Sequence, residues 1–346
     1  MVRVLAYASI AVSFCAAAPP NDRDELLQDL GVWKATHGQK AKAEGLLPNM
    51  INLNETELIL GRLRNAKNEV KKLKAENPQA EFDHLGPFAL LTTQEFADRV
   101  AKSFNIEAGN NGKRALRAAD VEASEAIPTT MDWSTSTCVN AIKNQGQCGS
   151  CWAFAATSAL ESAHCIKTGT LLNLSEQQLV SCDTKSSGCA GGYDLYALQN
   201  VLANGQCLSV NYPYTSGSNG VTGTCATSCT KTKLTVGSSI VSGGSGEVNL
   251  KNRVANQPVS VHVYAGNTAF QYYKSGILTS CKKGTSDHAV VALGYGSSNG
   301  VNYFKIRNSW GISWGELGYI RLANGGSTTS IGTCNVAQVT YFPSLT

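Results

Sequence analysis

The stretch QGQCGSCWAFAATSAL, residues 145–160, places two cysteines, Cys148 and Cys151, three positions apart. Such a pair occurs in redox couples, in metal sites, in disulfide frameworks, and where a nucleophilic cysteine stands beside a structural one. Helix-favouring residues follow Cys151 without a break as far as Thr168-Gly169. We therefore expect a helix that begins at Cys151, with Cys148 in the glycine-rich loop before it.

The first 18 residues have the pattern of a secretory signal peptide. One arginine, Arg3, precedes an apolar run that closes on small residues at 16–18. The run is shorter than the roughly 20 residues of a membrane-spanning helix, which argues against an N-terminal anchor. We expect residues 1–18 to be a signal peptide, no membrane span in the remainder, and a product that enters an oxidising compartment of the secretory pathway.

Charge and cysteine content divide the remaining chain into two parts. Residues 19–126 contain 15 Lys+Arg, 17 Asp+Glu and no cysteine, whereas residues 127–346 contain 13 Lys+Arg, 8 Asp+Glu and 11 of the 12 cysteines. This contrast predicts a charged helical segment followed by a disulfide-rich domain. The net charge of +4 is too small to indicate a nucleic-acid partner.

Helical periodicity dominates the first of these parts. Residues 55–77, ETELILGRLRNAKNEVKKLKAEN, repeat apolar positions at helical spacing and end at Asn77-Pro78. Residues 91–104, LTTQEFADRVAKSF, predict a second helix with a threonine N-cap at Thr92 or Thr93. Its apolar stripe comprises Phe96, Val100 and Phe104. We expect this part to bury little surface of its own, either as a solvated spacer or as an inhibitory segment that leans on the second part.

The second part has eleven cysteines, so in an oxidising compartment one of them stays unpaired. Cys151 is the candidate, because the start of a helix stabilises the thiolate, which is the nucleophilic form. A zinc site would need two more ligands, which Cys225 and Cys229 offer, but the compartment and the cysteine count favour disulfides. A thioredoxin-like redox pair is typical of a small α/β domain, and the surrounding chain is too long and too rich in cysteine for one.

A cysteine nucleophile needs a base, and the base needs a partner that orients it. The second part contains three histidines, of which His164 lies inside the expected helix of Cys151 and cannot reach its start. His288, in SDHAVVALGYG, stands at the mouth of an apolar run that predicts a buried strand. Another strand, YFKIR, ends at Asn308, whose amide can accept from one imidazole nitrogen under the cover of Trp310.

Three stretches together resemble the papain-like cysteine peptidases, namely QGQCGSCWAF, SDHAVVALGYG and NSWGISWGELGYIRL. Cys151 precedes His288 by 137 residues and Asn308 by 157, close to the spacing of that family. The resemblance covers nearly all of residues 127–346. It implies an α+β, papain-like two-lobed fold, with a helical lobe and a β-barrel-like lobe, preceded by a helical inhibitory propeptide at residues 19–126.

The resemblance also implies the roles of four residues. Cys151 is the nucleophile, His288 is the general base and later the acid, and Asn308 orients the imidazole. Gln145 stands at the position of the oxyanion donor, where the loss of one donor typically costs on the order of 10²–10³ in rate. The resting site should be a thiolate–imidazolium pair, and neither a metal nor another cofactor is expected.

The same resemblance implies three disulfides: Cys148–Cys189, Cys182–Cys225 and Cys281–Cys334. Four cysteines remain, and for these we expect two further pairs: Cys138–Cys165 and Cys207–Cys229.

A substrate wall is implied by GCAGGYD, residues 188–194, where Gly191 and Gly192 let a peptide backbone approach closely. The main specificity pocket should be lined by Tyr193, Asp194, His262, Ala289 and Val339. Its apolar members predict a hydrophobic residue two positions before the scissile bond, the P2 residue. His262 departs from the family, in which this position is small or aliphatic. If the imidazole faces the pocket, the enzyme should accept acidic or polar P2 residues at acid pH; otherwise His262 lies aside under Tyr264 or in solvent.

The expected propeptide keeps only part of the family's helical motif. Arg62 and Asn77 fit it, whereas Ala66, Glu69 and Leu90 replace its usual Phe, Asn and Asp. Inhibition is still expected, but the missing aspartate weakens the case for acid-triggered release. Two glycosylation sequons occur, at Asn54 and Asn173.

We therefore expect a cysteine endopeptidase made as a secretory zymogen and delivered to a lysosome or vacuole or outside the cell. Endopeptidase activity is favoured because the paired-histidine insertion of carboxydipeptidase relatives is absent from the sequence. Expected partners are peptide or protein substrates, the chain's own propeptide and cystatin-like protein inhibitors, and the enzyme should be a monomer. The rivals are a non-catalytic papain-like binding or storage protein and a thiol–disulfide oxidoreductase that uses Cys148.

Overall fold

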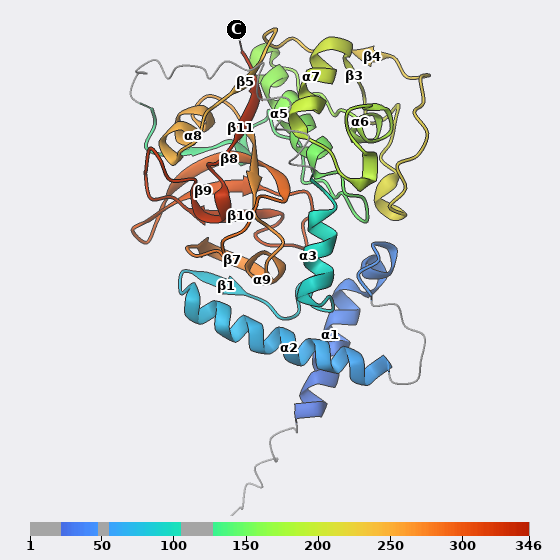
Figure 1. Ribbon diagram of the computed structural model, residues 1–346, viewed down its shortest axis with the longest axis vertical. Helices are drawn as coiled ribbons and strands as arrows, with labels where there is room; N and C mark the ends of the chain where they lie inside the picture. The colour runs from blue at the N-terminus through green and yellow to red at the C-terminus, as the bar shows by residue number, and fades with distance from the viewer. Residues whose placement is uncertain (1–21, 48–54, 105–126, 346) are drawn as a thin grey trace, which may run out of the picture.

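A computed structural model describes residues 22–47, 55–104 and 127–345. Residues 127–345, here called the C-terminal domain, form two lobes, one helical and one built on a twisted sheet (Figure 1). Residues 22–47 and 55–104, here called the N-terminal segment, lie along one end of this domain. The expected signal peptide and the expected boundary at residue 126 lie outside the described residues.

The helical lobe is built around α5 (Cys151–Thr168), which is buried from Cys151 to Cys165. Small and apolar side chains occur on all of its faces, which is the composition of a helix surrounded by protein. Gly169 ends it in the left-handed conformation, with φ of 75°, where glycine carries no Cβ penalty. α6 (Glu176–Cys182) and α7 (Asp194–Asn204) pack beside α5. The bounds of α5 confirm the expected helix start at Cys151 and its end at residues 168–169.

The second lobe is a mainly antiparallel sheet whose path runs β1-β7-β10-β9-β8-β6-β11-β5, with β2 paired to β8. Its central strand β8 (His288–Ser298) is the apolar run that the sequence predicted, and β9 (Val301–Arg307) is the strand before Asn308. The other strands of this sheet in the C-terminal domain are β2 (Met131–Asp132), β5 (Ile240–Ser242), β6 (Val259–Val263), β7 (Tyr273–Leu278), β10 (Tyr319–Ala323) and β11 (Thr340–Pro343).

Short elements complete the C-terminal domain. The helices α8 (Glu247–Val254) and α9 (Thr268–Tyr272) lie against the sheet lobe, and β3 (Gln206–Cys207) pairs with β4 (Lys231–Thr232) in the helical lobe. The 3₁₀ turns are η2 (Trp133–Thr135), η3 (Gly188–Ala190), η4 (Ser216–Ser218) and η5 (Thr333–Asn335).

Five disulfides are present, and Cys151 is the free cysteine of the described residues. The pairs are Cys138–Cys165, Cys148–Cys189, Cys182–Cys225, Cys207–Cys229 and Cys281–Cys334. They are the pairs that the sequence analysis expected. Four lie in the helical lobe and one lies in the sheet lobe, so each lobe is stapled on its own.

The N-terminal segment contains α1 (Asp22–Ala43), α2 (Glu55–Glu76), β1 (Ala80–Phe82) and α3 (Thr93–Ala101). The two helices expected from the sequence are present as α2 and α3, and Thr92 caps α3 in a reciprocal capping box with Glu95. Two expectations were wrong. The sequence analysis did not predict α1, and Phe104 does not continue the stripe of α3, because that helix ends at Ala101.

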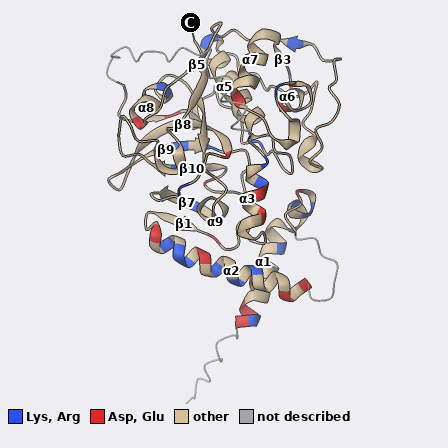
Figure 2. Ribbon diagram, in the orientation of Figure 1, with Lys and Arg blue, Asp and Glu red and all other residues tan. Residues whose placement is uncertain are grey.

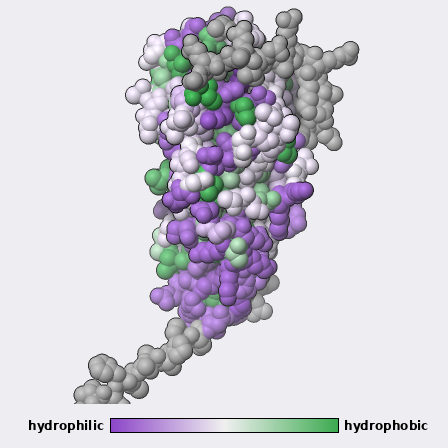
Figure 3. Space-filling model, turned by 90° about the vertical axis from the view of Figure 1, so that its left-hand side faces the viewer, coloured by the Kyte–Doolittle hydropathy of each residue, from purple (hydrophilic) through white to green (hydrophobic). Residues whose placement is uncertain are grey.

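The expectation that this segment buries little was also wrong. α1 and α2 cross at the lower end of the molecule (Figure 1), and their buried side chains, including fully buried Trp33 and Leu63, belong to one core with the sheet lobe. Trp33 donates its indole N–H to the carbonyl of Gly86 at 3.0 Å. Residues of both charge signs occur along these helices (Figure 2), and the same end of the surface is mostly hydrophilic in Figure 3. Because of this high charge, the sequence analysis underestimated how much of the segment is buried.

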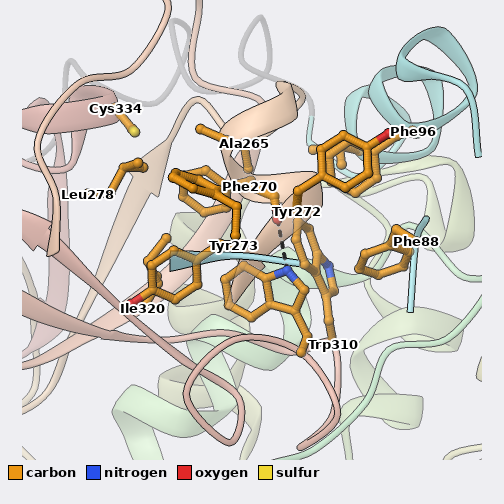
Figure 4. Close-up of a cluster of buried hydrophobic side chains, with 14 of the residues drawn as sticks. Phe88, Phe96, Ala265, Phe270, Tyr272, Tyr273, Leu278, Trp310, Ile320 and Cys334 are labelled. Carbon is orange, nitrogen blue, oxygen red and sulfur yellow. Dashed lines mark hydrogen bonds between the residues drawn. The ribbon is translucent and has the colours of Figure 1, made fainter. Parts of the chain in front are cut away.

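The N-terminal segment docks on the sheet lobe through backbone and side chains. β1 extends the sheet by antiparallel pairing with β7. Phe88 and Phe96 pack edge-on against Trp310, with ring centroids 5.3 and 5.7 Å away (Figure 4). Buried Asn77 accepts the backbone N–H of Ser280 at 2.7 Å, and that of Thr279 at 3.1 Å. The N-terminal segment is therefore held on the sheet lobe by strand pairing, aromatic packing and the hydrogen bonds of a buried amide.

Replacing Asn77 by alanine should loosen this docking, because two backbone N–H groups lose their acceptor. We expect amide hydrogen exchange of Thr279 and Ser280 to accelerate about 10-fold in Asn77→Ala, measured by mass spectrometry on the intact chain. Asn65→Ala, at an exposed position of α2, is the matched control and should exchange like the wild type. Equal exchange in the two variants would contradict the docking role of Asn77.

Candidate active site

Cys151 is the first residue of α5 and is completely buried. Its sulfur accepts the backbone N–H of Ala289 at 3.4 Å, so the start of α5 touches the start of β8 across the boundary between the lobes. The thiol also lies 3.3 Å from the carbonyl oxygen of Ser103, to which it donates. The sulfur is therefore held between the two lobes and covered by the N-terminal segment.

His288 opens β8 and immediately precedes Ala289. Its Nε2 lies 2.8 Å from the side-chain oxygen of Asn308, which also accepts the N–H of Ser309 and is thereby fixed in orientation. The imidazole stacks on Trp310, with centroids 4.8 Å apart and planes inclined by 24°. Its other nitrogen, Nδ1, is buried and has no hydrogen-bond partner among the described residues. The free nitrogen is the one available for proton exchange.

Gln145 lies in the loop before α5 with its side chain buried. Its oxygen accepts from the hydroxyl of Ser309 at 2.7 Å, which fixes the amide with its NH₂ group turned toward the covered cleft. That NH₂ group donates to the carbonyl of Cys148 at 3.1 Å and lies 3.5 Å from the Ser103 hydroxyl. Ser309, which orients both Gln145 and Asn308, was not predicted, because no motif in the sequence pointed to it.

The N-terminal segment closes the site through residues 99–104. Arg99 donates to the carbonyls of Gly146 and Glu44, at 2.5 and 3.1 Å, and so ties α3 to the loop that carries Gln145. Beyond α3, the backbone of Phe104 pairs with that of Gly192 as an isolated parallel bridge. The chain thus reaches the site through Ser103, in the turn after α3, and Phe104, which pairs with Gly192.

The substrate wall predicted at residues 191–192 is occupied by this crossing chain. A Cβ on Gly191 would lie 2.7 Å from the carbonyl oxygen of Lys102, and one on Gly192 would lie 2.5 Å from the ring of Trp152. Gly191 therefore permits the close approach of a backbone, as expected, whereas Gly192 is required by packing on α5. The two glycines serve different purposes.

Phe104 fills a pocket whose walls are aromatic rings. Its ring centroid is 5.2 Å from that of Tyr193 and 4.4 Å from that of His262. Ala289 and half-buried Val339 belong to the same apolar cluster. Of the five residues expected to line a specificity pocket, Tyr193 and His262 contact Phe104, and Ala289 and Val339 belong to its cluster.

The structure corrects the expected position of Asp194 and decides between the two positions considered for His262. Asp194 does not line it directly, because the carboxylate is fully buried and bonded to Ser260 and to Nε2 of His262, the latter at 2.8 Å. His262 lies neither under Tyr264 nor in solvent, since it is 1% exposed and packs against Phe104, Tyr193 and Tyr341. The reason is pairing: a buried carboxylate needs donors, and His262 and Ser260 provide them.

Burial controls the protonation of the site. Desolvation raises the pKa of the Cys151 thiol, and the nearby carboxylates of Asp194 and Asp287 raise it further. The hydrogen bond from the Ala289 N–H opposes this change by lowering the pKa. Desolvation lowers the pKa of His288 to about 4, although the bond to Asn308 opposes the change. Beneath the N-terminal segment both groups are therefore neutral, in contrast to the ion pair expected for the uncovered site.

The sequence analysis also singled out His164, Asn173 and Asn54. His164 lies within α5, where its Nδ1 accepts the N–H of Thr235 at 2.9 Å, away from the site as expected. Asn173 is exposed, and Asn54 lies outside the described residues. Among the described residues there is no cluster of three metal-ligating side chains, and none of the helices is long and apolar enough to cross a bilayer.

Residues 127–344 match the model of the papain family of cysteine proteases, and the chain belongs to this family. It is 45% identical over 223 residues to "Cysteine proteinase COT44" of Brassica napus, covering 63% of this chain and 66% of that protein. It is 34% identical to "Senescence-specific cysteine protease SAG12" of Arabidopsis thaliana, covering 99% of both chains. The first curated relatives are matched over about half to two thirds of their own length.

Solved precursors have the same overall fold. The proform of the ragweed pollen allergen Amb a 11 cysteine protease superposes with a TM-score of 0.78 at 28% identity, covering 95% of this chain and 98% of that one. Recombinant stem bromelain precursor gives a TM-score of 0.78 at 30% identity, covering 93% and 99%. The expected papain-like α+β fold is confirmed, and the likeness extends over the N-terminal segment, which is the family's propeptide.

Uncovering the site should activate the thiol, because each pKa unit removed from Cys151 increases the thiolate fraction at neutral pH about tenfold. We expect iodoacetamide to alkylate Cys151 at least about tenfold faster once the N-terminal segment is removed. The rate should rise steadily with pH in the intact chain and become nearly flat from about pH 5 to pH 8 in the uncovered enzyme. Alkylation is read by mass spectrometry.

Cys151→Ser serves as the control and should take up no label, because the other described cysteines are paired. The same rate and the same pH profile in covered and uncovered protein would contradict the proposed effect of burial.

Proposed function

We propose that this chain is the zymogen of a cysteine endopeptidase that cleaves peptide bonds through Cys151, His288 and Asn308. The observation that carries the proposal is the convergence of these three residues and Gln145 at the junction of the lobes. The sulfur, the free imidazole nitrogen and the amide donor come from α5, β8 and the loop before α5. Membership of the papain family of cysteine proteases supports it.

In the uncovered site, the Cys151 proton passes to Nδ1 of His288, and the thiolate attacks the carbonyl carbon of the scissile bond. The negative oxygen that forms accepts hydrogen bonds from the Gln145 amide and from the backbone N–H of Cys151, which has no partner within the helix at its first turn. Collapse of this intermediate transfers the proton from His288 to the leaving amine. Water, deprotonated by His288, then hydrolyses the thioester and restores the thiol.

Asn308 keeps the imidazole productive throughout these steps. Its oxygen accepts from Nε2, which leaves Nδ1 directed at the exchange with sulfur, and it stabilises the imidazolium that forms. Trp310 covers the pair and excludes water from the hydrogen bond.

The N-terminal segment is proposed to act as the inhibitor of this site. Ser103 and Phe104 occupy the places of a substrate backbone and side chain, and their burial of the thiol keeps it protonated. Release of the segment both opens the cleft and restores the ion pair. The residues that join the segment to the C-terminal domain lie outside the described residues, so the cleavage bond stays a prediction.

The pocket around Phe104 supports a hydrophobic P2 preference. Its walls are the rings of Tyr193 and His262, with Ala289 and Val339 nearby. The idea that acid pH opens this pocket to acidic side chains is not favoured, because Asp194 already supplies the negative partner of His262. A second carboxylate would be repelled at close range.

The two rival functions find less support. A thiol–disulfide oxidoreductase would use Cys148, but Cys148 is paired with Cys189 rather than with Cys151. A non-catalytic binding protein would have no need of the ordered set of hydrogen bonds around His288 and Gln145. Five disulfides support passage through the secretory pathway, toward a vacuole or lysosome or outside the cell. Protein substrates, cystatin-like inhibitors and a monomeric state are part of this proposal.

Cys151→Ser should abolish both reporter cleavage and self-shortening of the chain, since no nucleophile remains. Gln145→Ala, assayed after removal of the N-terminal segment, should lose about 10²–10³ in kcat through the missing oxyanion donor. Gln147→Ala is the matched control, two residues away with an exposed amide, and should stay near wild type. Activity of Cys151→Ser equal to that of the wild type would refute the proposed nucleophile.

Phe104→Ala should shorten the latency of the zymogen, because truncation of a buried phenylalanine typically costs about 3–5 kcal/mol. The lag before reporter cleavage, after transfer of the full chain to mildly acidic reducing buffer, measures this effect. Lys102→Ala alters an exposed neighbour and should leave the lag unchanged. An unaltered lag in Phe104→Ala would show that inhibition does not depend on this pocket.

A further inference from the structure

The pocket that holds Phe104 ends on three buried polar residues, Asp194, Ser260 and His262. Asp194 is the first residue of α7 in the helical lobe, whereas Ser260 and His262 point the same way from β6 in the sheet lobe. The Asp194 carboxylate accepts from the Ser260 hydroxyl at one oxygen and lies 2.8 Å from Nε2 of His262 at the other. This polar cluster joins the two lobes beneath the cleft.

The carboxylate fixes the orientation of the His262 ring. With Nε2 bound to Asp194, the imidazole cannot rotate without leaving a buried charge unpaired, which is costly. The fixed ring meets Phe104 at 61°, with centroids 4.4 Å apart, an edge-to-face arrangement that aromatic pairs favour. Tyr193 and Tyr341 flank the same imidazole, with centroids 5.3 and 5.7 Å away. The pocket is thus lined by rings held at fixed angles.

We propose that His262 is a specificity-determining residue, positioned by Asp194, which makes this pocket select an aromatic P2 side chain over an aliphatic one. The inference rests on the proposed peptidase function and goes beyond a general hydrophobic preference. Phe104 identifies the class of ligand, because it is the side chain that this chain places in the pocket. Asp194 acts through His262 and is a positioning residue.

The preference has a geometric cause. A phenylalanine or tyrosine side chain at P2 can meet the imidazole edge-to-face and lie tilted against Tyr193, as Phe104 does. A leucine side chain fills similar space but offers no ring quadrupole to the polar edge of the imidazole. An acidic side chain would bring a second anion close to Asp194. The chemistry of the pocket therefore favours aromatic rings over both.

Two reporter peptides that differ only in phenylalanine or leucine at P2 test the proposal. Enzyme released from the full-length zymogen is titrated with iodoacetamide, so that kcat/KM refers to active thiol only. We expect the phenylalanine-to-leucine ratio to fall about 2- to 10-fold in His262→Val, the range of one aromatic pair. An unchanged ratio would overturn the proposal, as would faster cleavage of a glutamate P2 peptide than of the phenylalanine one at about pH 5.

Two variants of Asp194 test its positioning role, one that removes the acceptor for Nε2 of His262 and one that keeps it. Asp194→Ala frees the imidazole and should lower the same ratio, whereas Asp194→Asn keeps an oxygen acceptor for Nε2 and should restore most of it. His164→Val is the matched control, because His164 lies in α5 and bonds to Thr235, away from the pocket. Equal ratios in Asp194→Ala and wild type would refute the positioning role.

Failure of this inference and failure of the proposed function give different results. If wild-type enzyme with a titratable Cys151 cleaves neither peptide, the peptidase proposal fails. If it cleaves both and the ratio does not respond to residue 262, only the specificity proposal fails. Should His262→Val not fold, His262→Phe keeps a ring at the site and should retain a higher ratio than Asp194→Ala.

Discussion

The contact between the start of α5 and the start of β8 is the constraint on which the site depends. A nucleophile at the first turn of a helix gains stabilisation from the helix terminus, but its base cannot come from the same helix. The hydrogen bond from the Ala289 N–H to the Cys151 sulfur brings the second lobe against that terminus. His288 immediately precedes Ala289 in the chain and so enters the same junction. The two lobes are stapled separately, so this junction is made by packing and hydrogen bonds and not by a covalent link.

The N-terminal segment covers this junction, and the cover has an electrostatic consequence as well as a steric one. A thiolate–imidazolium pair is stable only while water or fixed dipoles solvate its charges. Burial beneath the N-terminal segment raises the pKa of Cys151 and lowers that of His288, which favours the neutral pair. In the proposed function, the segment inhibits without distorting Cys151, His288 and Asn308. It leaves these residues assembled and removes the solvation that their charged form requires.

Local sequence predicted which residues come together in the candidate site but not the packing of the N-terminal segment. Cys151, His288 and Asn308 occur in short motifs at the boundaries of regular elements, where a glycine loop or an apolar run is visible in the sequence itself. α1 was missed because its apolar positions, such as Leu26 and Trp33, are widely spaced among charges. Phe104 was assigned to a helical stripe because its spacing fits one. Its departure into the pocket depends on the partner domain, which no local pattern encodes.

His262 shows why one residue is harder to interpret than a motif. The sequence indicated an unusual histidine in an apolar strand, but its role depends on Asp194, 68 residues earlier and in the other lobe. The His262–Asp194 pair therefore bears on two properties, the binding of the N-terminal segment and the choice of substrate. In the proposed function, Phe104 and a substrate side chain use the same ring-lined space, so we expect a change at His262 to alter both the binding of the N-terminal segment and the choice of substrate. Substitutions there must satisfy both ligands, which favours an inhibitory residue that resembles the preferred substrate.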